Sequence, residues 1–336
     1  MLGQLSLTNR ILPSNQSPLG ARPRRFRQPR LLIVGCGDVG LRVARALPPS
    51  MRVLALTSSP ERAPLLRAAG MVPLLGNLDD AASLARLSGL ATHVLHLAPP
   101  PTHNETQWWR DPRTQRLVRT LRQRSLPRAL VYGSTTGVYG DCAGALVAET
   151  RPVAPHTPRA QRRVDAEQSV RLLGRAQQAG GAVRTSILRI PGIYAADRDG
   201  GTPRARLAKG TPVLRAQDDV YTNHIHANDL ARACIAALWR GKPQRVVNVC
   251  DHSQLKMGDY FDQAADLYGM HRPPRVARNT AQDQLPLMLL SFMSESRRLV
   301  NTRMQAELRV TLQYPTTLDG LRTEAQLAGN SLEARL

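Results

Sequence analysis

The sequence lacks any apolar run that approaches the ~20 residues needed to span a bilayer. Aromatic residues are scarce, at 4% of the 336 residues. The four cysteines are Cys36, Cys142, Cys234 and Cys250, with neither a C-x-x-C pair nor metal-ligand spacing. We therefore expect a cytoplasmic protein with free thiols and with neither a metal site nor a membrane partner.

Acidic residues are also few, with 25 Asp and Glu against 46 Lys and Arg, which gives a net charge of +21. Lysine occurs only at Lys209, Lys242 and Lys256, so nearly all of this charge is arginine. The arginines are spread over every expected helix, and aromatic side chains that stack on bases are rare. Specific nucleic-acid binding is therefore not expected, although the field alone favours weak attraction to polyanions.

Residues 1–29 differ from the rest of the chain. They contain no acidic residue, and prolines at 13, 18, 23 and 29 interrupt any periodicity. We predict a basic, disordered tail, with an early start codon or an organellar presequence as the alternatives.

The chain is organised around one stretch, residues 31–40. Four apolar residues predict a buried strand, and Gly35, Gly37 and Gly40 come next at G-x-G-x-x-G spacing before a helical pattern that ends at Pro48. In a dinucleotide site the first glycine makes the turn, the second lets backbone approach a pyrophosphate, and the third packs helix against strand. The alternative is a tight strand–helix turn that binds nothing.

Strand and helix patterns then alternate to about residue 190, which predicts an α/β fold with a doubly wound parallel sheet. Residues 30–190 form the expected nucleotide-binding domain, and residues 191–330 complete the sheet and form a smaller lobe. Ligands bind such sheets outside the carboxyl ends of the strands. The binding candidates are therefore Gly35, Cys36, Gly37, Asp38, Val39, Gly40, Thr57, Ser58, Arg62, Asn77, Leu78, Ala98, Pro99 and the segment 134–136.

Several motifs together resemble the extended short-chain dehydrogenase/reductases, the NAD-dependent epimerase/dehydratase group, and an atypical branch of it. Besides the glycine stretch, they are residues 76–79 (GNLD), 134–141 (STTGVYGD), 188–194 (LRIPGIY) and 223–230 (NHIHANDL). The resemblance implies a Rossmann-type NAD(P) domain with a small C-terminal substrate lobe. It places Asn77 and Leu78 beside the adenine, Ala98 beside the cofactor, and Thr135 as the catalytic hydroxyl.

The chain departs from the family at its Tyr-x-x-x-Lys motif, where Arg159 and Arg163 stand instead. Arginine has no proton to exchange near pH 7, so Arg159 cannot act as the tyrosine does. Arg163 can still bind the cofactor ribose or a phosphate. Weak candidates for the proton donor are Tyr139, Tyr194, His156 and His226.

The end of the second expected strand bears on the choice of cofactor. An acidic residue there favours NAD and an arginine favours NADP. Thr57 and Ser58 followed by Arg62 fit a 2′-phosphate, so we expect NADP rather than NAD, unless Arg62 is merely solvated.

These patterns predict an NAD(P)-dependent oxidoreductase or epimerase-like enzyme acting on a small, sugar-nucleotide-like substrate. The alternative is an NAD(P)-binding sensor or scaffold without turnover. A homodimer formed through the helices expected at residues 113–124 and 159–178 would match the family.

Overall fold

The computed structural model describes residues 28–102, 107–178 and 181–323. The tail predicted for residues 1–29 therefore lies, apart from its last two residues, outside the described part of the chain.

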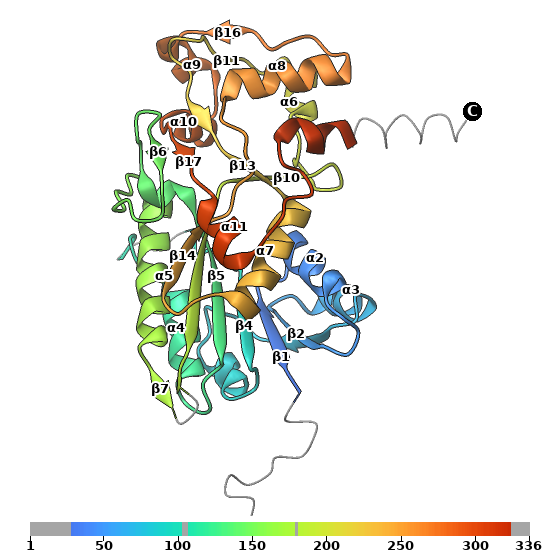
Figure 1. Cartoon of the computed structure of the whole chain (residues 1–336), viewed down its shortest axis with the longest axis vertical. Coiled ribbons are helices and arrows are strands. Elements are labelled where there is room, and N and C mark those ends of the chain that lie inside the picture. Colours follow the sequence, from blue (N-terminus) through green and yellow to red (C-terminus); the bar gives the residue numbers. More distant parts are fainter. Residues whose placement is uncertain (1–27, 103–106, 179–180, 324–336) are drawn as a thin grey trace, which may run out of the picture.

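A seven-stranded sheet forms the centre of the molecule (Figure 1), in the order β14-β9-β5-β4-β1-β2-β3. Every neighbouring pair is parallel, which confirms the predicted doubly wound α/β architecture. The order reverses beside β1, and ligands bind parallel sheets at such a reversal. The strands are β1 (Arg30–Val34), β2 (Arg52–Thr57), β3 (Val72–Leu75), β4 (His93–His96), β5 (Ala129–Thr135), β9 (Arg184–Ile190) and β14 (Arg245–Asn248).

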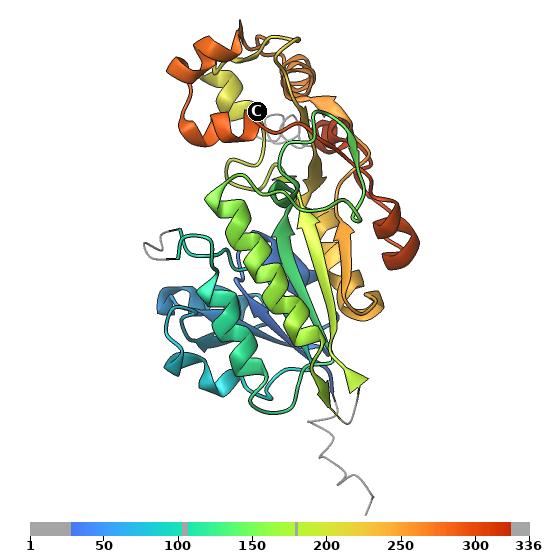
Figure 2. The same cartoon turned by 90° about the vertical axis from the view of Figure 1, so that its left-hand side faces the viewer.

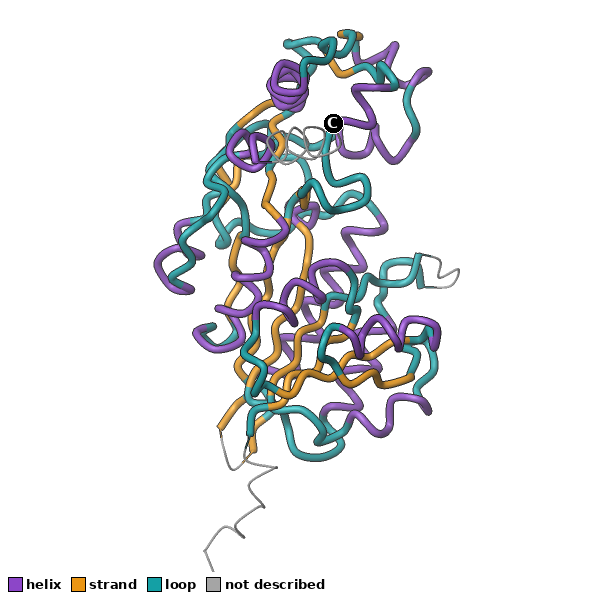
Figure 3. The backbone as a smooth tube through the Cα atoms, turned by 90° about the vertical axis from the view of Figure 1, so that its right-hand side faces the viewer, coloured by secondary structure: helices purple, strands orange, loops and turns teal. Residues whose placement is uncertain are grey.

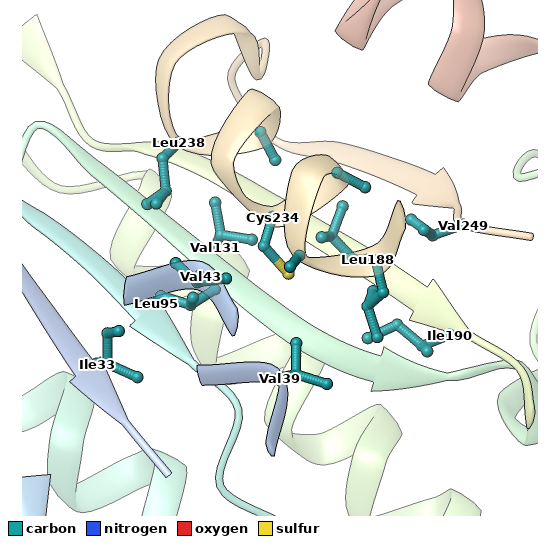
Figure 4. Packing of buried hydrophobic residues seen from close by; sticks show 14 of the residues in the cluster. Ile33, Val39, Val43, Leu95, Val131, Leu188, Ile190, Cys234, Leu238 and Val249 are labelled. Atoms are coloured by element: carbon teal, nitrogen blue, oxygen red, sulfur yellow. The ribbon is translucent and has the colours of Figure 1, made fainter. Parts of the chain in front are cut away.

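Helices cover both faces of this sheet because each strand in its centre is apolar on both sides. One face packs under α2 (Asp38–Ala46), α3 (Ala63–Ala68), α7 (Ala227–Arg240) and α11 (Thr302–Leu308). In Figure 4, Cys234 and Leu238 of α7 lie over Val131 and Leu188 of the sheet. The other face packs under the 3₁₀ turn η2 (Ala82–Leu87), α4 (Pro112–Leu121) and α5 (Pro158–Gly174).

The two helices of the second face begin at well-defined caps. The Asp111 side chain accepts hydrogen bonds from the backbone N–H groups of Arg113 and Thr114, and Pro112 follows it at the first helical position. Thr157 caps α5 in the same way, with Pro158 next. Figure 2 shows α5 running along the sheet beside α4.

The predicted helix limits differ from the structure by a few residues. The helix expected at residues 113–124 runs from Pro112 to Leu121, and the one expected to end at 178 stops at Gly174. After β3 the chain forms only the 3₁₀ turn η2, and the Asp80 carboxylate accepts a hydrogen bond from Ala82 N in a local turn at its start.

A smaller lobe lies beyond the carboxyl ends of the strands, as Figures 2 and 3 show. It has its own apolar core, which includes Tyr260, Phe261 and Leu207. Its elements are α6 (Arg204–Ala208), β11 (Val213–Leu214), α8 (Met257–Tyr268), β16 (Arg275–Val276), α9 (Arg278–Gln284) and α10 (Leu287–Met293).

Short strand pairs join the sheet to this lobe. The parallel pair β10 (Gly192–Tyr194) and β13 (His224–His226) leads from β9 and α7 toward the lobe. Two others pair β12 (Tyr221–Thr222) with β15 (Leu255–Lys256) and β6 (Leu146–Val147) with β17 (Arg298–Leu299). The pair of β7 (Gln177–Gln178) with β8 (Gly181–Ala182) lies instead between α5 and β9, at the end of the sheet away from the lobe (Figure 1).

Within the described ranges, no helix combines the length and the apolar character that a membrane crossing requires.

Candidate functional site

The glycine loop joins β1 to α2 at the point where the strand order reverses. Gly35 has φ +82°, and a Cβ there would collide with the backbone of Ala98. Gly40 packs its Cα against Cys36 and Ile33, so helix and strand lie close together. A Cβ on Gly37, by contrast, would meet nothing within 4 Å. The loop therefore holds its shape through Gly35 and Gly40 and leaves open space at Gly37, the residue before α2.

Two neighbouring residues of this loop differ in character. Cys36 is buried, its thiol lies 3.7 Å from the Met71 sulfur, and burial raises the pKa of Cys36 to about 11. Asp38, in the first turn of α2, forms ion pairs with Arg42 at 3.0 Å and with Arg198 at 2.9 Å. The two arginines offset a carboxylate that would otherwise repel an anion at this helix end.

The residues expected at the ribose lie after β2. Thr57 is buried and its hydroxyl closes a local turn with Ser59, while Ser58 is exposed. The Arg62 guanidinium donates a hydrogen bond to the carbonyl of Cys36 at 2.7 Å. Arg62 is therefore held across the glycine loop rather than extended into solvent.

The residues expected at the adenine lie after β3 and β4. Leu78 and Ala98 are buried, whereas Asn77 and Pro99 are exposed. The Asn77 side chain accepts a hydrogen bond from Asp79 N, and Asp79 forms a two-point ion pair with Arg113 of α4. This pair ties the segment after β3 to the segment after β4.

A cavity of about 550 Å³ lies between the carboxyl edge of the sheet and the lobe. It is bordered by the ends of β5 and β9, by α5, and by lobe residues from α6 and α8, while the described glycine-loop residues lie outside it. Among the described residues, its charged lining side chains are one carboxylate, Glu295, and five arginines at positions 159, 163, 198, 206 and 297.

Five residues singled out from the sequence border this cavity: Thr135, Thr136, Arg159, Arg163 and Tyr194. Thr135 ends β5, and its hydroxyl accepts a hydrogen bond from Gly137 N at 3.3 Å, which leaves the hydroxyl hydrogen for donation. Arg163 donates hydrogen bonds to the Tyr132 hydroxyl and the Gly133 carbonyl. Arg159, one turn earlier on α5, is exposed at the cavity wall.

The structure gives the two candidate tyrosines other partners. Tyr139 is 1% exposed and its hydroxyl donates to Asn248 at 2.7 Å, beneath the Arg189 guanidinium. Tyr194 borders the cavity, but its hydroxyl donates to the carbonyl of Thr316, and burial raises its pKa. Both hydroxyls thus donate hydrogen bonds to other protein groups.

Of His156, His224 and His226, only His224 lines the cavity. His226 caps α7 by accepting a hydrogen bond from Asn228 N and stacks on Tyr314, and His156 is exposed beside Gly140. His224 borders the cavity, where it lies against Tyr260, and burial lowers its pKa to about 4. A neutral imidazole therefore lines the cavity near pH 7.

Glu295 is a site residue that sequence reasoning missed. A Cβ built on Gly137 would lie 3.8 Å from both Glu295 Oε2 and Thr135 Oγ1, so carboxylate and hydroxyl border the same side of Gly137. Arg297 holds Oε2 at 2.8 Å, whereas Oε1 is enclosed with no hydrogen-bond partner among the described residues. No motif marks Glu295, because it lies in an irregular segment far along the chain from Thr135.

No group of three or more metal-ligating side chains occurs within residues 28–102, 107–178 and 181–323. The fold and this edge define a dinucleotide-binding α/β protein with a substrate-sized cavity beside the nucleotide loop.

Comparisons with known proteins agree with this class. The family model described as "NAD dependent epimerase/dehydratase family" matches residues 31–250, so the chain belongs to that family. The comparison with curated proteins gave no match.

Solved structures match over nearly their whole length. A conserved protein of unknown function from Silicibacter pomeroyi is 29% identical, with a TM-score of 0.69, and the match covers 90% of this chain and 99% of that one. The UDP-glucuronic acid 4-epimerase of Bacillus cereus, in complex with UDP-glucuronic acid and NAD, is 17% identical, with a TM-score of 0.68 and coverage of 90% and 99%. Human epimerase family protein SDR39U1 (isoform 2), with NADPH, is 17% identical, with a TM-score of 0.69 and coverage of 88% and 99%.

Proposed function

We propose that this chain is an NAD(P)-dependent oxidoreductase or epimerase-type enzyme acting on a small substrate. The observation that carries the proposal is the placement of Thr135, at the carboxyl end of β5, on a cavity at the carboxyl edge of the sheet, the edge at which the glycine loop also lies. NAD(P), when bound, supplies a hydride acceptor or donor. The glycine loop and the N-terminus of α2 hold its pyrophosphate, with open space at Gly37.

In this proposal Thr135 donates its hydroxyl hydrogen to the substrate oxygen, and Arg163 and the Gly192 segment flank the reacting carbon. Glu295 takes the place of the missing tyrosine. NAD(P) would serve as the hydride acceptor in the oxidation of an alcohol, and the Glu295 carboxylate would take the O–H proton of that alcohol. Arg297 keeps the carboxylate beside Gly137.

NADP is the proposed cofactor. Arg62 follows β2 in the chain, and its guanidinium bonds the Cys36 carbonyl of the glycine loop. A 2′-phosphate bound at the end of β2 would reach this guanidinium and the hydroxyl of exposed Ser58. The neighbouring structures contain NAD in one case and NADPH in another. A sugar-nucleotide-like substrate is proposed because the Bacillus cereus epimerase holds UDP-glucuronic acid.

The test is turnover with Thr135→Val and Glu295→Gln. Purified protein is assayed for NADPH oxidation with a panel of aldehydes and ketones, and for NADP reduction with UDP-glucose and UDP-glucuronic acid. We expect either variant to lower kcat by about 100-fold, because each removes a group that contacts the reacting oxygen or its proton. NADPH affinity should remain within about twofold of the wild type.

Thr280→Val, at an exposed position on α9, is the matched control and should leave kcat unchanged. Wild-type kinetics in both variants would refute the assigned roles. Binding of NADPH without turnover of any panel compound would favour the second candidate, a cofactor-binding sensor or scaffold. That candidate is supported by the arginines at positions 159 and 163, which replace the acid–base tyrosine and its lysine.

A further inference from the structure

Arg206 borders the cavity from the lobe side. It lies on α6, and its guanidinium stands 4.3 Å over the ring of Phe261. Its Nε and Nη2 atoms are enclosed and have no hydrogen-bond partner among the described residues. Burial lowers the pKa of Arg206, and no carboxylate contributes to that shift.

Burying guanidinium donors without acceptors is energetically unfavourable, because the donors lose their hydrogen bonds to water and form none within the protein. Other arginines on the cavity wall do have partners. Arg198 pairs with Asp38, and Arg297 pairs with Glu295. Arg204, on the same short helix, is exposed and lies over Tyr268. Arg297 also has an enclosed Nε without a partner, but its guanidinium is paired with Glu295, whereas Arg206 has two enclosed donors and no ion pair among the described residues.

The surroundings define the chemistry that would use these donors. The described cavity wall carries five arginines and one glutamate, so its potential favours an anion. The Arg206 guanidinium lies over Phe261, and two further lining side chains, Tyr260 and neutral His224, pack against each other and add no negative charge. A planar guanidinium presents paired N–H groups that match the oxygens of a phosphate or a carboxylate.

We propose that Arg206 anchors an anionic group of the substrate, a phosphate or a carboxylate, at the lobe end of the cavity. The anchor comes from α6 in the lobe, whereas Thr135 ends β5 of the central sheet, so the two residues border the cavity from different parts of the fold. This assignment rests on the proposed function in one respect, that the cavity receives the substrate.

The test compares Arg206→Met with Arg204→Met by thermal unfolding. Each is measured in sodium chloride and, at equal ionic strength, in inorganic phosphate and in malonate. Methionine keeps the contact with Phe261 and removes the enclosed charge, so Arg206→Met should raise the Tm of the ligand-free protein by about 2 °C or more. Arg204→Met should leave it within about 1 °C.

Phosphate, malonate or both should raise the Tm of the wild type and of Arg204→Met, with at least tenfold weaker apparent affinity in Arg206→Met. A response to phosphate alone identifies a phosphate group, and a response to malonate alone identifies a carboxylate. A lower Tm in Arg206→Met would show a structural arginine and overturn the proposal. An unchanged response to both anions in Arg206→Met, or no response in the wild type, would also overturn it.

NADPH titration of the same variants separates this inference from the proposed function. Arg206→Met should bind NADPH as the wild type does, because Arg206 lies in the lobe, away from the glycine loop. If NADPH fails to bind any of the proteins, the proposed function fails, while the anion measurements still decide the role of Arg206. If Arg206→Met alone loses NADPH, the assignment of Arg206 to the substrate is wrong.

Discussion

The three glycines after β1 are one residue type with three physical roles. Gly35 needs its positive φ and its missing Cβ, Gly40 needs only the missing Cβ, and Gly37 needs neither for folding. A glycine that the fold does not require, at the N-terminus of a helix, is typical of a position where a ligand approaches the backbone. The spacing of the three could be read from the sequence because the turn and the packing of α2 on β1 are local, whereas the contact of Gly35 with Ala98 depends on the pairing of β1 with β4.

Gly35→Ala should destabilise the protein by about 3 kcal/mol or more, since the added methyl combines backbone strain with a collision at Ala98. Gly70→Ala is the matched control. Gly70 has φ +76° but open surroundings, so only the strain applies, about 1 kcal/mol. Urea unfolding of both variants measures the difference. Equal losses would mean that the close approach at Ala98 is unimportant.

Other site residues could not be found from the sequence. Glu295 and Arg206 stand in no motif, and their significance comes from enclosure and from missing partners, which only the tertiary structure creates. Tyr139 is the opposite case, because its motif suggested chemistry while its hydroxyl is bound to Asn248. Sequence motifs report which residues lie near a strand end and not which atoms face the cavity.

Among the elements, the parallel central sheet could be predicted from the alternation of strand and helix patterns. Buried parallel strands are continuous apolar runs, and the glycines, prolines and caps that bound them are local signals. The lobe was described only loosely, because its strands are two or three residues long and are fixed by contacts between distant segments. Asp229 illustrates this. It lies in the first turn of α7 and accepts hydrogen bonds from Gln313 N and Tyr314 N, which are far along the chain.

A buried ion pair joins α5 to the strands beneath Thr135. Glu167 accepts two hydrogen bonds from Arg189 of β9 and one from Ser134 of β5, and both charged side chains are 4% exposed. Glu167→Gln should destabilise the protein by about 3–5 kcal/mol, because it leaves the arginine charge buried without its partner.

The double variant Glu167→Leu/Arg189→Met should be less destabilised than Glu167→Gln, since it removes both charges together. Asp266→Asn, which breaks the exposed pair with Arg272, should change stability little. Chemical denaturation measures all three. A Glu167→Gln variant as stable as Asp266→Asn would show that the buried pair does not hold α5 on the sheet.

Across the whole molecule, many arginines donate hydrogen bonds to backbone carbonyls of the protein itself. Arg184 donates to the carbonyls of Leu238, Trp239 and Gly241 at the end of α7, and Arg240 donates to those of Leu308 and Arg309. Arginines at helix ends satisfy carbonyls that have no partner within the helix. This use accounts for arginines spread over many elements.

A network of ion pairs and hydrogen bonds links the glycine loop to the cavity. Arg42 of α2 bonds Asp197 and Asn228, and Arg198 bonds Asp38, so the segment after β10 is tied to the helix at the glycine loop. Arg198 also borders the cavity. The nucleotide loop and the cavity thus share one network of charges, although residues 38 and 198 are far apart in the sequence.

The central claim is that a dinucleotide lies across the N-terminus of α2, and calorimetric titration with NADPH and NADH tests it most directly. The account predicts that the wild type binds NADPH more tightly than NADH. It also predicts that Gly37→Val keeps its thermal stability within about 0.5 kcal/mol and loses NADPH affinity at least tenfold, because the side chain fills the open space that the pyrophosphate needs. Gly70→Ala should bind as the wild type does. Absence of binding by the folded wild type, or undiminished binding by Gly37→Val, would contradict the account.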